Sequence, residues 1–253
     1  MDPLVIVLLA ITAFLAGIVD AIAGGGGLIT LPALLAAGLP PHVALGTNKG
    51  QSVWGSGAAL LAFWRAGRVD KQQAVLAFPL GLIGAAIGAE LVLLVDPAAL
   101  RPLVVVMLIA ASALLVIRKP TRDEAEPVGD RAQRYLLLAA ALAFVIGAYD
   151  GFFGPGTGTF LIVGFVALCG KSLTAATADA KVVNFASNLA SLAAFALAGT
   201  VAWAVALPMA AGQLVGGLVG ARLAIRGGAR LIRVMVLVVS GALIAKLVVD
   251  LVR

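Results

Sequence analysis

Long apolar runs alternate with short polar stretches along nearly the whole chain. The runs cover residues 5–23, 43–63, 74–95, 103–117, 136–153, 182–198, 201–219 and 234–249. Each approaches or reaches the roughly 20 residues that an α-helix needs to cross the hydrocarbon core of a bilayer. The pattern therefore predicts an all-α integral membrane protein.

Composition and charge favour the same class. Of the 253 residues, 62% are hydrophobic and 12% are charged, about half the charged fraction of a soluble domain. No Lys or Arg precedes the first apolar run, so we expect a retained helix and not a cleaved signal peptide. Basic residues in short loops explain the net charge of +6. The expected partner is therefore the lipid bilayer and not nucleic acid.

The chain contains an internal repeat. Residues 17–24 match residues 147–154 at an offset of 130, and Thr47-Asn48-Lys49 matches Asp179-Ala180-Lys181 at an offset of 132. One small insertion therefore aligns the two halves from end to end. A repeat of this length indicates a duplicated structural unit.

A long polar stretch at 118–134 separates the two halves. We interpret it as a cytoplasmic linker inside one transmembrane domain that covers 1–253. Repeat 1 is then expected at 1–117 and repeat 2 at 135–253.

Each repeat is expected to hold five hydrophobic segments. In the first half these lie at about 4–23, 28–38, 43–65, 73–95 and 99–117. The second segment would span roughly 16 Å, about half of the hydrocarbon core. A glycine-rich joint precedes it at 24–27, and the second half has its counterpart at 154–158. Such joints interrupt a regular helix, so each repeat is predicted to contain a Gly-rich broken hairpin and a short half-helix.

The distribution of basic residues predicts the topology. If each broken hairpin returns to its starting side, thirteen basic residues fall on one face and two on the other. If it makes a single crossing instead, the division is nine to six. The positive-inside rule favours the first arrangement. It places both termini outside the cytoplasm and makes the halves inverted repeats, a common design in secondary transporters.

The glycine joints are candidate anion-binding elements. Glycine allows backbone amides to approach a ligand closely, and the N-terminus of the following helix carries partial positive charge. We expect a sharp turn, with positive φ, at the equivalent residues Gly26 and Gly156. A joint that serves only as a tight turn or a packing contact is the alternative.

A polar stripe follows each joint, on the third segment of each half. Lys49 and Ser52 share helical spacing, and so do Lys181, Asn184 and Asn188. Polar groups inside a span must face the bundle interior or an aqueous cavity, although a lysine near the end of a span can also extend to the headgroups. The candidate substrate-binding residues are Gly24, Gly25, Gly26, Gly27, Thr47, Asn48, Lys49, Ser52, Gly154, Gly156, Thr157, Gly158, Lys181, Asn184 and Asn188.

Three aspartates are candidates for coupling or structural roles. Asp20 and Asp150 are equivalent in the repeat, and Asp179 heads the second polar stripe. Each could bind a coupling proton or cation, or hold a glycine joint through its amides. With one histidine and one cysteine in the chain, neither a metal site nor a cofactor is expected.

Glycines also recur at four-residue spacing in the fourth segment of each half. They are Gly84 and Gly88 in the first half, and Gly212, Gly216 and Gly220 in the second. Small residues at this spacing let membrane helices approach closely. The prediction is helix packing, either within the chain or between copies of a homo-oligomer.

The glycine joint and the stripe that follows it resemble a known family. Asp20, the run from Gly24 to Gly27, Pro32 and Thr47-Asn48-Lys49 are similar to the sulfite exporter TauE/SafE family, and Asp150, residues 154–158 and Lys181 look like its second repeat. The resemblance implies a multi-pass permease of the bacterial inner membrane. It also implies a small anionic substrate, sulfite or an organosulfonate such as sulfoacetate, that is moved outward.

Three functions remain open. The first is a secondary transporter of small anions that works by alternating access, and a passive anion channel is the second. The third is an intramembrane aspartyl protease that uses Asp20 and Asp150, because Tyr149-Asp150 matches one of the two protease motifs. The second motif, Gly-x-Gly-Asp, is absent, since Thr157 follows Gly156. Inverted repeats would also bring the two aspartates in from opposite faces, whereas a catalytic pair must nearly touch.

Overall fold

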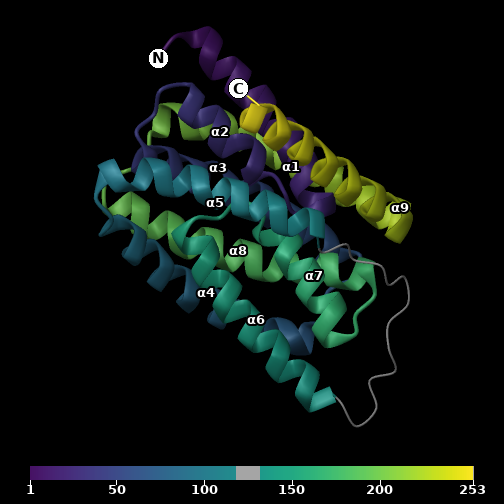
Figure 1. Ribbon diagram of the computed structural model, residues 1–253. Helices are drawn as coiled ribbons and strands as arrows, with labels where there is room; N and C mark the ends of the chain where they lie inside the picture. The colour runs from purple at the N-terminus through teal and green to yellow at the C-terminus, as the bar shows by residue number, and fades with distance from the viewer. Residues whose placement is uncertain (118–131, 253) are drawn as a thin grey trace.

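The described part of the chain is helical throughout. The computed structural model describes residues 1–117 and 132–252, and gives only the backbone for 101, 112–117, 236–237 and 239–252. The helices are α1 (Pro3–Ala23), α2 (Gly27–Ala36), α3 (Pro41–Arg65), α4 (Lys71–Leu93), α5 (Pro97–Ile117), α6 (Ala132–Phe152), α7 (Thr157–Cys169), α8 (Leu173–Leu197) and α9 (Trp203–Val252) (Figure 1). This set of helices confirms the all-α class. It includes a short helix, α2 or α7, after each glycine joint.

One boundary differs from that predicted. Helix α6 begins at Ala132, so the last three residues of the expected linker are helical, and residues 118–131 lie outside the described part. The two final apolar runs lie on the two parts of α9, which meet at a kink where Gly228 has non-helical angles (φ 56°, ψ −155°). A residue with a Cβ rarely adopts this backbone conformation, so a glycine marks the bend.

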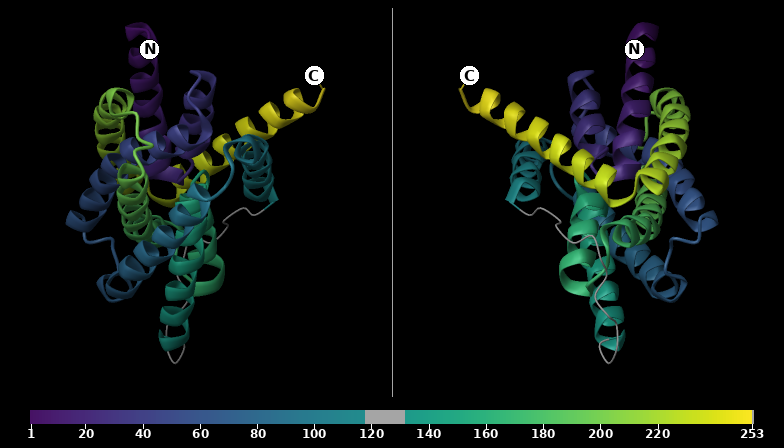
Figure 2. Two further views of the ribbon diagram at one scale, coloured as in Figure 1. Left: turned by 90° about the vertical axis from the view of Figure 1, so that its left-hand side faces the viewer. Right: turned by 90° about the vertical axis from the view of Figure 1, so that its right-hand side faces the viewer.

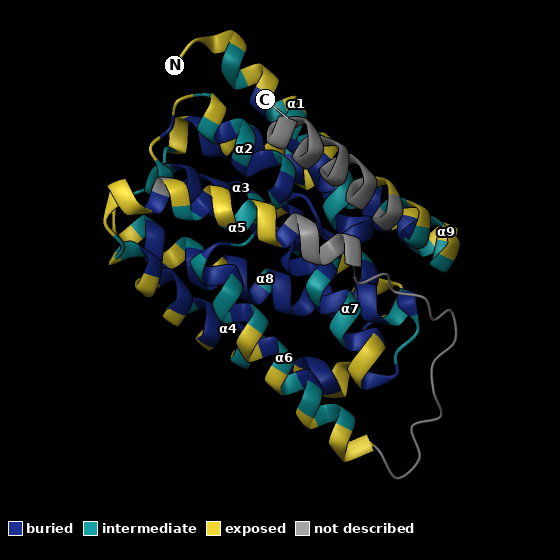
Figure 3. Ribbon diagram, in the orientation of Figure 1, coloured by how far each residue is buried: buried dark blue, intermediate teal, exposed yellow. Residues whose placement is uncertain are grey.

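Many large apolar side chains lie on the surface, and a group of polar and charged side chains is buried beside the apolar core; Figure 3 shows which parts of the chain are buried and which are exposed. Large apolar side chains such as Leu8, Ile87 and Val145 are exposed, whereas Lys49 and Lys181 are buried. In the described residues, five helices are long and apolar enough to cross a membrane: α1, α4, α6, α8 and the 203–235 part of α9. Helix α3 has the same length as α8, and its buried polar residues lower its hydropathy.

The helices of the two halves interleave. Helix α1 packs along α9 and α4 packs along α6. Helix α3 packs against α9 and α1, α8 packs chiefly against α4 and α6, and α3 and α8 contact each other. The predicted glycine contacts lie within the chain. A Cβ on Gly84 would come within 2.2 Å of the Phe144 carbonyl oxygen, and one on Gly216 within 2.1 Å of the Phe14 carbonyl oxygen. The backbones therefore touch, and glycine is required at these crossings.

The first helices of the two halves start at opposite ends of the molecule. The start of α1 and the end of α9 lie at one end, and the start of α6 lies at the opposite end (Figures 1 and 2). Helices α2 and α7 have only 10 and 13 residues. Their glycine joints therefore come to lie inside the helix bundle.

Candidate functional site

The two glycine joints lie directly against each other. A Cβ on Gly24 would come within 2.3 Å of the Gly158 carbonyl carbon. Thr159 fastens the contact, because its amide donates to the Gly24 oxygen (3.2 Å) and its hydroxyl donates to the Ala23 oxygen (2.6 Å). The joints of the two repeats thus form one structure.

The turns in these joints differ in part from the prediction. Positive φ occurs at the equivalent residues Gly24 (80°) and Gly154 (98°), and also at Gly156 (87°). Gly26 instead has helical angles (φ −56°, ψ −40°) and caps α2. The expected turn at Gly26 is therefore wrong: the chain has already turned at Gly24, so that the amide of Gly26 faces Asp20.

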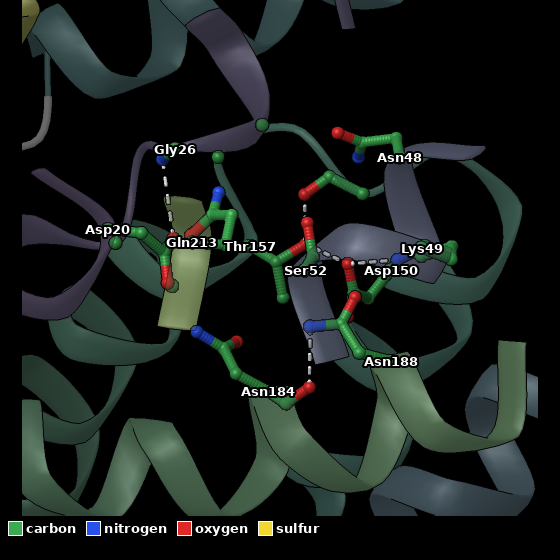
Figure 4. Close-up of a pocket in the computed structure, with 15 residues that line it drawn as sticks. Asp20, Gly26, Asn48, Lys49, Ser52, Asp150, Thr157, Asn184, Asn188 and Gln213 are labelled. Atoms are coloured by element: carbon green, nitrogen blue, oxygen red, sulfur yellow. Dashed lines mark hydrogen bonds and ion pairs between the residues drawn. The ribbon is translucent and has the colours of Figure 1, made fainter. Parts of the chain in front are cut away.

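A small polar cavity of about 30 Å³ lies beside the joints (Figure 4). Its walls are Asp20, Gly24, Gly26, Gly27, Asn48, Lys49, Ser52, Asp150, Gly154, Gly156, Thr157, Gly158, Asn184, Asn188 and Gln213. Both joints and both polar stripes therefore contribute to one site. Its volume suits one or two water molecules, so a larger ligand requires side chains to move.

Lys49 of α3 is paired with Asp150 of α6. Its ammonium lies 2.7 Å from Asp150 Oδ1, with the two side chains only 2% and 5% exposed. Thr157 donates to the same oxygen (2.9 Å), and Ser187 donates to Asp150 Oδ2. Nearly complete burial and the ion pair with Asp150 argue against a snorkelling role for Lys49.

Lys181 of α8 is paired with Asp20 of α1, so here the lysine comes from the second half and the aspartate from the first. Its ammonium donates to the main-chain oxygen of Asp20 and lies 3.3 Å from Asp20 Oδ2. The other carboxylate oxygen, Oδ1, accepts from the amide of Gly26 (3.3 Å). The Lys181 side chain is fully buried, whereas that of Asp20 is 24% exposed. Asp20 thus bridges a lysine and the start of α2.

The two asparagines that follow the lysines differ in their bonding. Asn48 Oδ1 accepts from Thr30 (2.6 Å) and from Gln51 (3.0 Å). Asn184 Oδ1 is buried and has no hydrogen-bond partner among the residues that the structure describes, and its amide points toward the cavity (Figure 4). A side-chain amide carries both donor and acceptor atoms, so Asn184 can offer either to a ligand.

Some predicted site residues lie elsewhere. Gly25, Thr47 and Lys181 do not line the cavity, and Lys181 reaches it only through Asp20. The Thr47 hydroxyl oxygen accepts from the Ala202 amide (3.0 Å), just before α9. This position heads the polar stripe, one turn too early to reach the cavity.

Asp179 also lies outside the cavity, in a separate ion-pair cluster. Its Oδ1 accepts from the Asp70 amide (2.8 Å), and Lys171 pairs with the carboxylates of both aspartates, 3.0 Å from Asp70 Oδ2. These three residues line a second cavity of about 660 Å³. The cluster joins the α3–α4 loop to the α7–α8 loop.

Both loop residues of this cluster have shifted pKa values. Burial acts to raise the pKa of Asp70, but hydrogen bonds from the Gln73 amide and Lys171 outweigh it and lower the pKa. Burial acts to lower the pKa of Lys171, yet Asp179 and Asp70 together raise it. Both loop residues are therefore charged at neutral pH.

One cavity residue was missed from the sequence. Gln213 of α9 is 3% exposed, and its Oε1 would lie within 2.7 Å of a Cβ on Gly17 and 2.5 Å of one on Gly55. The sequence contains a signal for this residue: Gln213 interrupts the apolar run 201–219, and a polar side chain inside a membrane span is costly unless it faces a cavity or a partner.

Asp20 and Asp150 both line this one cavity, although inverted repeats were expected to bring them in from opposite faces of the membrane. Each is paired with a lysine from the other half. A protease dyad instead needs two carboxylates that share a proton.

Comparison with known proteins identifies relatives over almost the whole chain. Residues 9–247 match the model of the family described as sulfite exporter TauE/SafE. A probable membrane transporter protein of Haemophilus influenzae is 40% identical over 239 residues, which cover 94% of this chain and 92% of the relative. The probable membrane transporter protein ORF9 of a Sinorhizobium species is 41% identical over 244 residues (96% and 92%). YfcA of Escherichia coli, also named a probable membrane transporter protein, is 40% identical over 251 residues (98% and 91%). No solved structure matches the chain.

Proposed function

Because the chain belongs to the sulfite exporter TauE/SafE family of membrane transporters, we propose that it exports small anions such as sulfite or organosulfonates by alternating access. The site is the cavity between the two broken hairpins, and the membrane is the bacterial inner membrane. The protein is a multi-pass membrane protein with helices long enough to span a bilayer. Residues 1–253 act as one transporter domain.

The observation that carries this proposal is the convergence of anion-binding groups on one buried cavity. Lys49 lines it and Lys181 reaches its edge through Asp20. Two glycine joints supply backbone amides there, and Gly26 and Gly156 cap the starts of α2 and α7. Helix N-termini and lysines both favour negative charge. The amides of Asn184 and Asn188 add neutral hydrogen-bonding groups.

Alternating access follows from the relation between the halves. Lys49 of repeat 1 pairs with Asp150 of repeat 2, and Lys181 of repeat 2 pairs with Asp20 of repeat 1. The glycine contacts between α4 and α6 and between α9 and α1 follow the same exchange. We therefore infer a two-fold axis between the halves. It lies in the membrane plane, because α1 and α6 start at opposite ends (Figure 2). Rocking of one repeat against the other then opens the shared cavity to each side in turn.

Reconstituted protein tests this function directly. Liposomes that contain the purified protein are loaded with sulfite, sulfoacetate, methanesulfonate, sulfate or chloride, and uptake of the labelled anion is followed. We expect saturable uptake and counterflow with sulfite or a sulfonate. Non-saturating flux without counterflow would support the passive channel, and no flux with any of these anions would contradict the proposed function.

Topology provides a second test. We propose that both termini face the periplasm and that the α3–α4 loop faces the cytoplasm, because of the thirteen-to-two division of basic residues. Cys169, the one native cysteine, is buried and is replaced by serine as background. A membrane-impermeant maleimide added outside intact cells should label Asp2→Cys and leave Arg68→Cys unlabelled until the membrane is permeabilised. The reverse labelling pattern would overturn the inverted-repeat topology.

A further inference from the structure

The ionisable side chains around the cavity balance in charge. Asp20, Lys49 and Asp150 line the cavity, and Lys181 contacts Asp20. Helices α2 and α7 contribute no charged side chain, and the α9 residue at the cavity is the neutral Gln213. Two ammonium groups thus face two carboxylates. An anion that enters adds a negative charge with no counter-charge, which is costly in a site removed from water.

The two lysine–aspartate pairs are not equally tight. Asp150 accepts from Lys49, Thr157 and Ser187 and is 5% exposed. Asp20 is 24% exposed, and its carboxylate makes two contacts of 3.3 Å. The closest contact of Lys181 is with the main-chain oxygen of Asp20 and not with its carboxylate. The Asp20 carboxylate can therefore leave while Lys181 keeps its main-chain anchor.

The Asp20 carboxylate already occupies an anion-binding position. One of its oxygens accepts from the amide of Gly26 at the start of α2, and the other faces the ammonium of Lys181. These are the two kinds of donor that a bound anion uses. The cavity of about 30 Å³ is too small for sulfite while this carboxylate stays in place, since it has room for only one or two waters. Displacement of Asp20 would supply the donors and the space together.

We propose that Asp20 is a tethered carboxylate that the transported anion displaces, and that it takes up one proton as it leaves Lys181, so that anion and proton cross together in the same direction. Net export by this route is then driven by an outward gradient of the anion that exceeds the inward proton gradient. The inference rests on the proposed function, namely that this cavity carries the anion. The carboxylate becomes a neutral carboxyl group and the anion replaces its charge beside Lys181. The net charge of the site stays constant for a monovalent anion, and a divalent anion would need one more proton.

Methanesulfonate is the best probe, because this monoanion keeps its charge across neutral pH, and sulfite serves as a second probe. Proteoliposomes without a membrane potential are given an external pH one unit below the internal pH, with a trapped pH dye. The wild type should accumulate the anion about tenfold, since one pH unit corresponds to a factor of ten, and should carry about one proton per anion. Uptake without proton movement, or accumulation driven only by a Na⁺ gradient, would overturn the inference.

Asp20→Asn separates coupling from transport, because asparagine mimics the neutral carboxyl group. We expect counterflow at equal pH to persist, whatever its rate, and the pH-driven accumulation to fall from about tenfold to none. Uptake should instead follow an inside-positive membrane potential, and the anion should raise the thermal stability of the variant more than that of wild type.

The matched control is Asp150→Asn, the equivalent change in the tighter pair. Accumulation by any surviving Asp150→Asn protein should still follow the pH gradient. Coupling that persists in Asp20→Asn, or that disappears only in Asp150→Asn, would overturn the role of Asp20. If wild-type protein shows no counterflow with either probe, the proposed function itself fails, an outcome distinct from counterflow without protons.

Discussion

Lys49→Ala is expected to abolish anion accumulation and to destabilise the protein. Its ammonium is the nearest cationic partner of Asp150, at 2.7 Å in a pair whose side chains are 2% and 5% exposed. Removal of one partner from a buried pair costs about 3–5 kcal/mol of stability, because the remaining charge is left uncompensated. Loss of a charged hydrogen bond to the substrate should weaken anion affinity a further 10- to 150-fold, about 1.5–3 kcal/mol.

A double variant separates these two effects. Asp150→Asn removes the uncompensated carboxylate, so Lys49→Ala/Asp150→Asn should recover much of the lost thermal stability. Anion affinity should stay low in the double variant, because the cationic group is still missing. Thermal unfolding in detergent and counterflow in liposomes measure the two properties. Wild-type affinity in the double variant would show that Lys49 only neutralises Asp150.

The broken hairpins could be predicted because their causes are local in the sequence. A run of glycines precedes an apolar stretch that is too short to span a bilayer, and both features occur at the equivalent places in each half. The structure contains the corresponding short helices, α2 after Gly26 and α7 after Gly156. Features of this kind depend on neighbouring residues and hardly on contacts between residues far apart in the sequence.

The pairing of the charges depends on long-range packing and could not be predicted. The repeat shows that Lys49 and Lys181 are equivalent, but not which aspartate each of them faces. That choice follows from the crossings of α1 with α9 and of α4 with α6. The lysines were therefore interpreted as free anion ligands, whereas each is bound to a carboxylate of the other half.

The cluster around Lys171 shows a second limit. Asp179 was predicted to have a coupling or structural role, yet it lies outside the cavity and its equivalent in the first half is the neutral Thr47. Each accepts a hydrogen bond from an amide just before a helix of the other half: Asp179 from the Asp70 amide before α4, and Thr47 from the Ala202 amide before α9. The equivalent residues Asp179 and Thr47 thus have the same structural role with different side chains, and only the three-dimensional structure shows that role.

Gly24→Ala is expected to be the most damaging single methyl addition in the joints. Gly24 has φ 80°, and its Cβ would lie 2.3 Å from the Gly158 carbonyl carbon and 2.5 Å from the Thr159 amide nitrogen. The left-handed conformation costs an L-residue about 1–2 kcal/mol, and overpacking against backbone adds about 1–3 kcal/mol. The backbone of the second joint cannot easily retreat, because Thr159 is hydrogen-bonded to Gly24 and Ala23.

The matched control is Gly38→Ala, which isolates the cost of the backbone conformation. Gly38 has φ 89° in the α2–α3 loop, and its Cβ would meet no atom within 4 Å. It should therefore lose only about 1–2 kcal/mol and keep normal counterflow. Gly24→Ala should lose substantially more stability in thermal unfolding. Its remaining folded protein should bind anion poorly, because the two joints must move apart and carry the Gly26 amide away from its place beside Asp20. Equal losses in the two variants would mean that the contact between the joints yields easily and does not hold the amides in position.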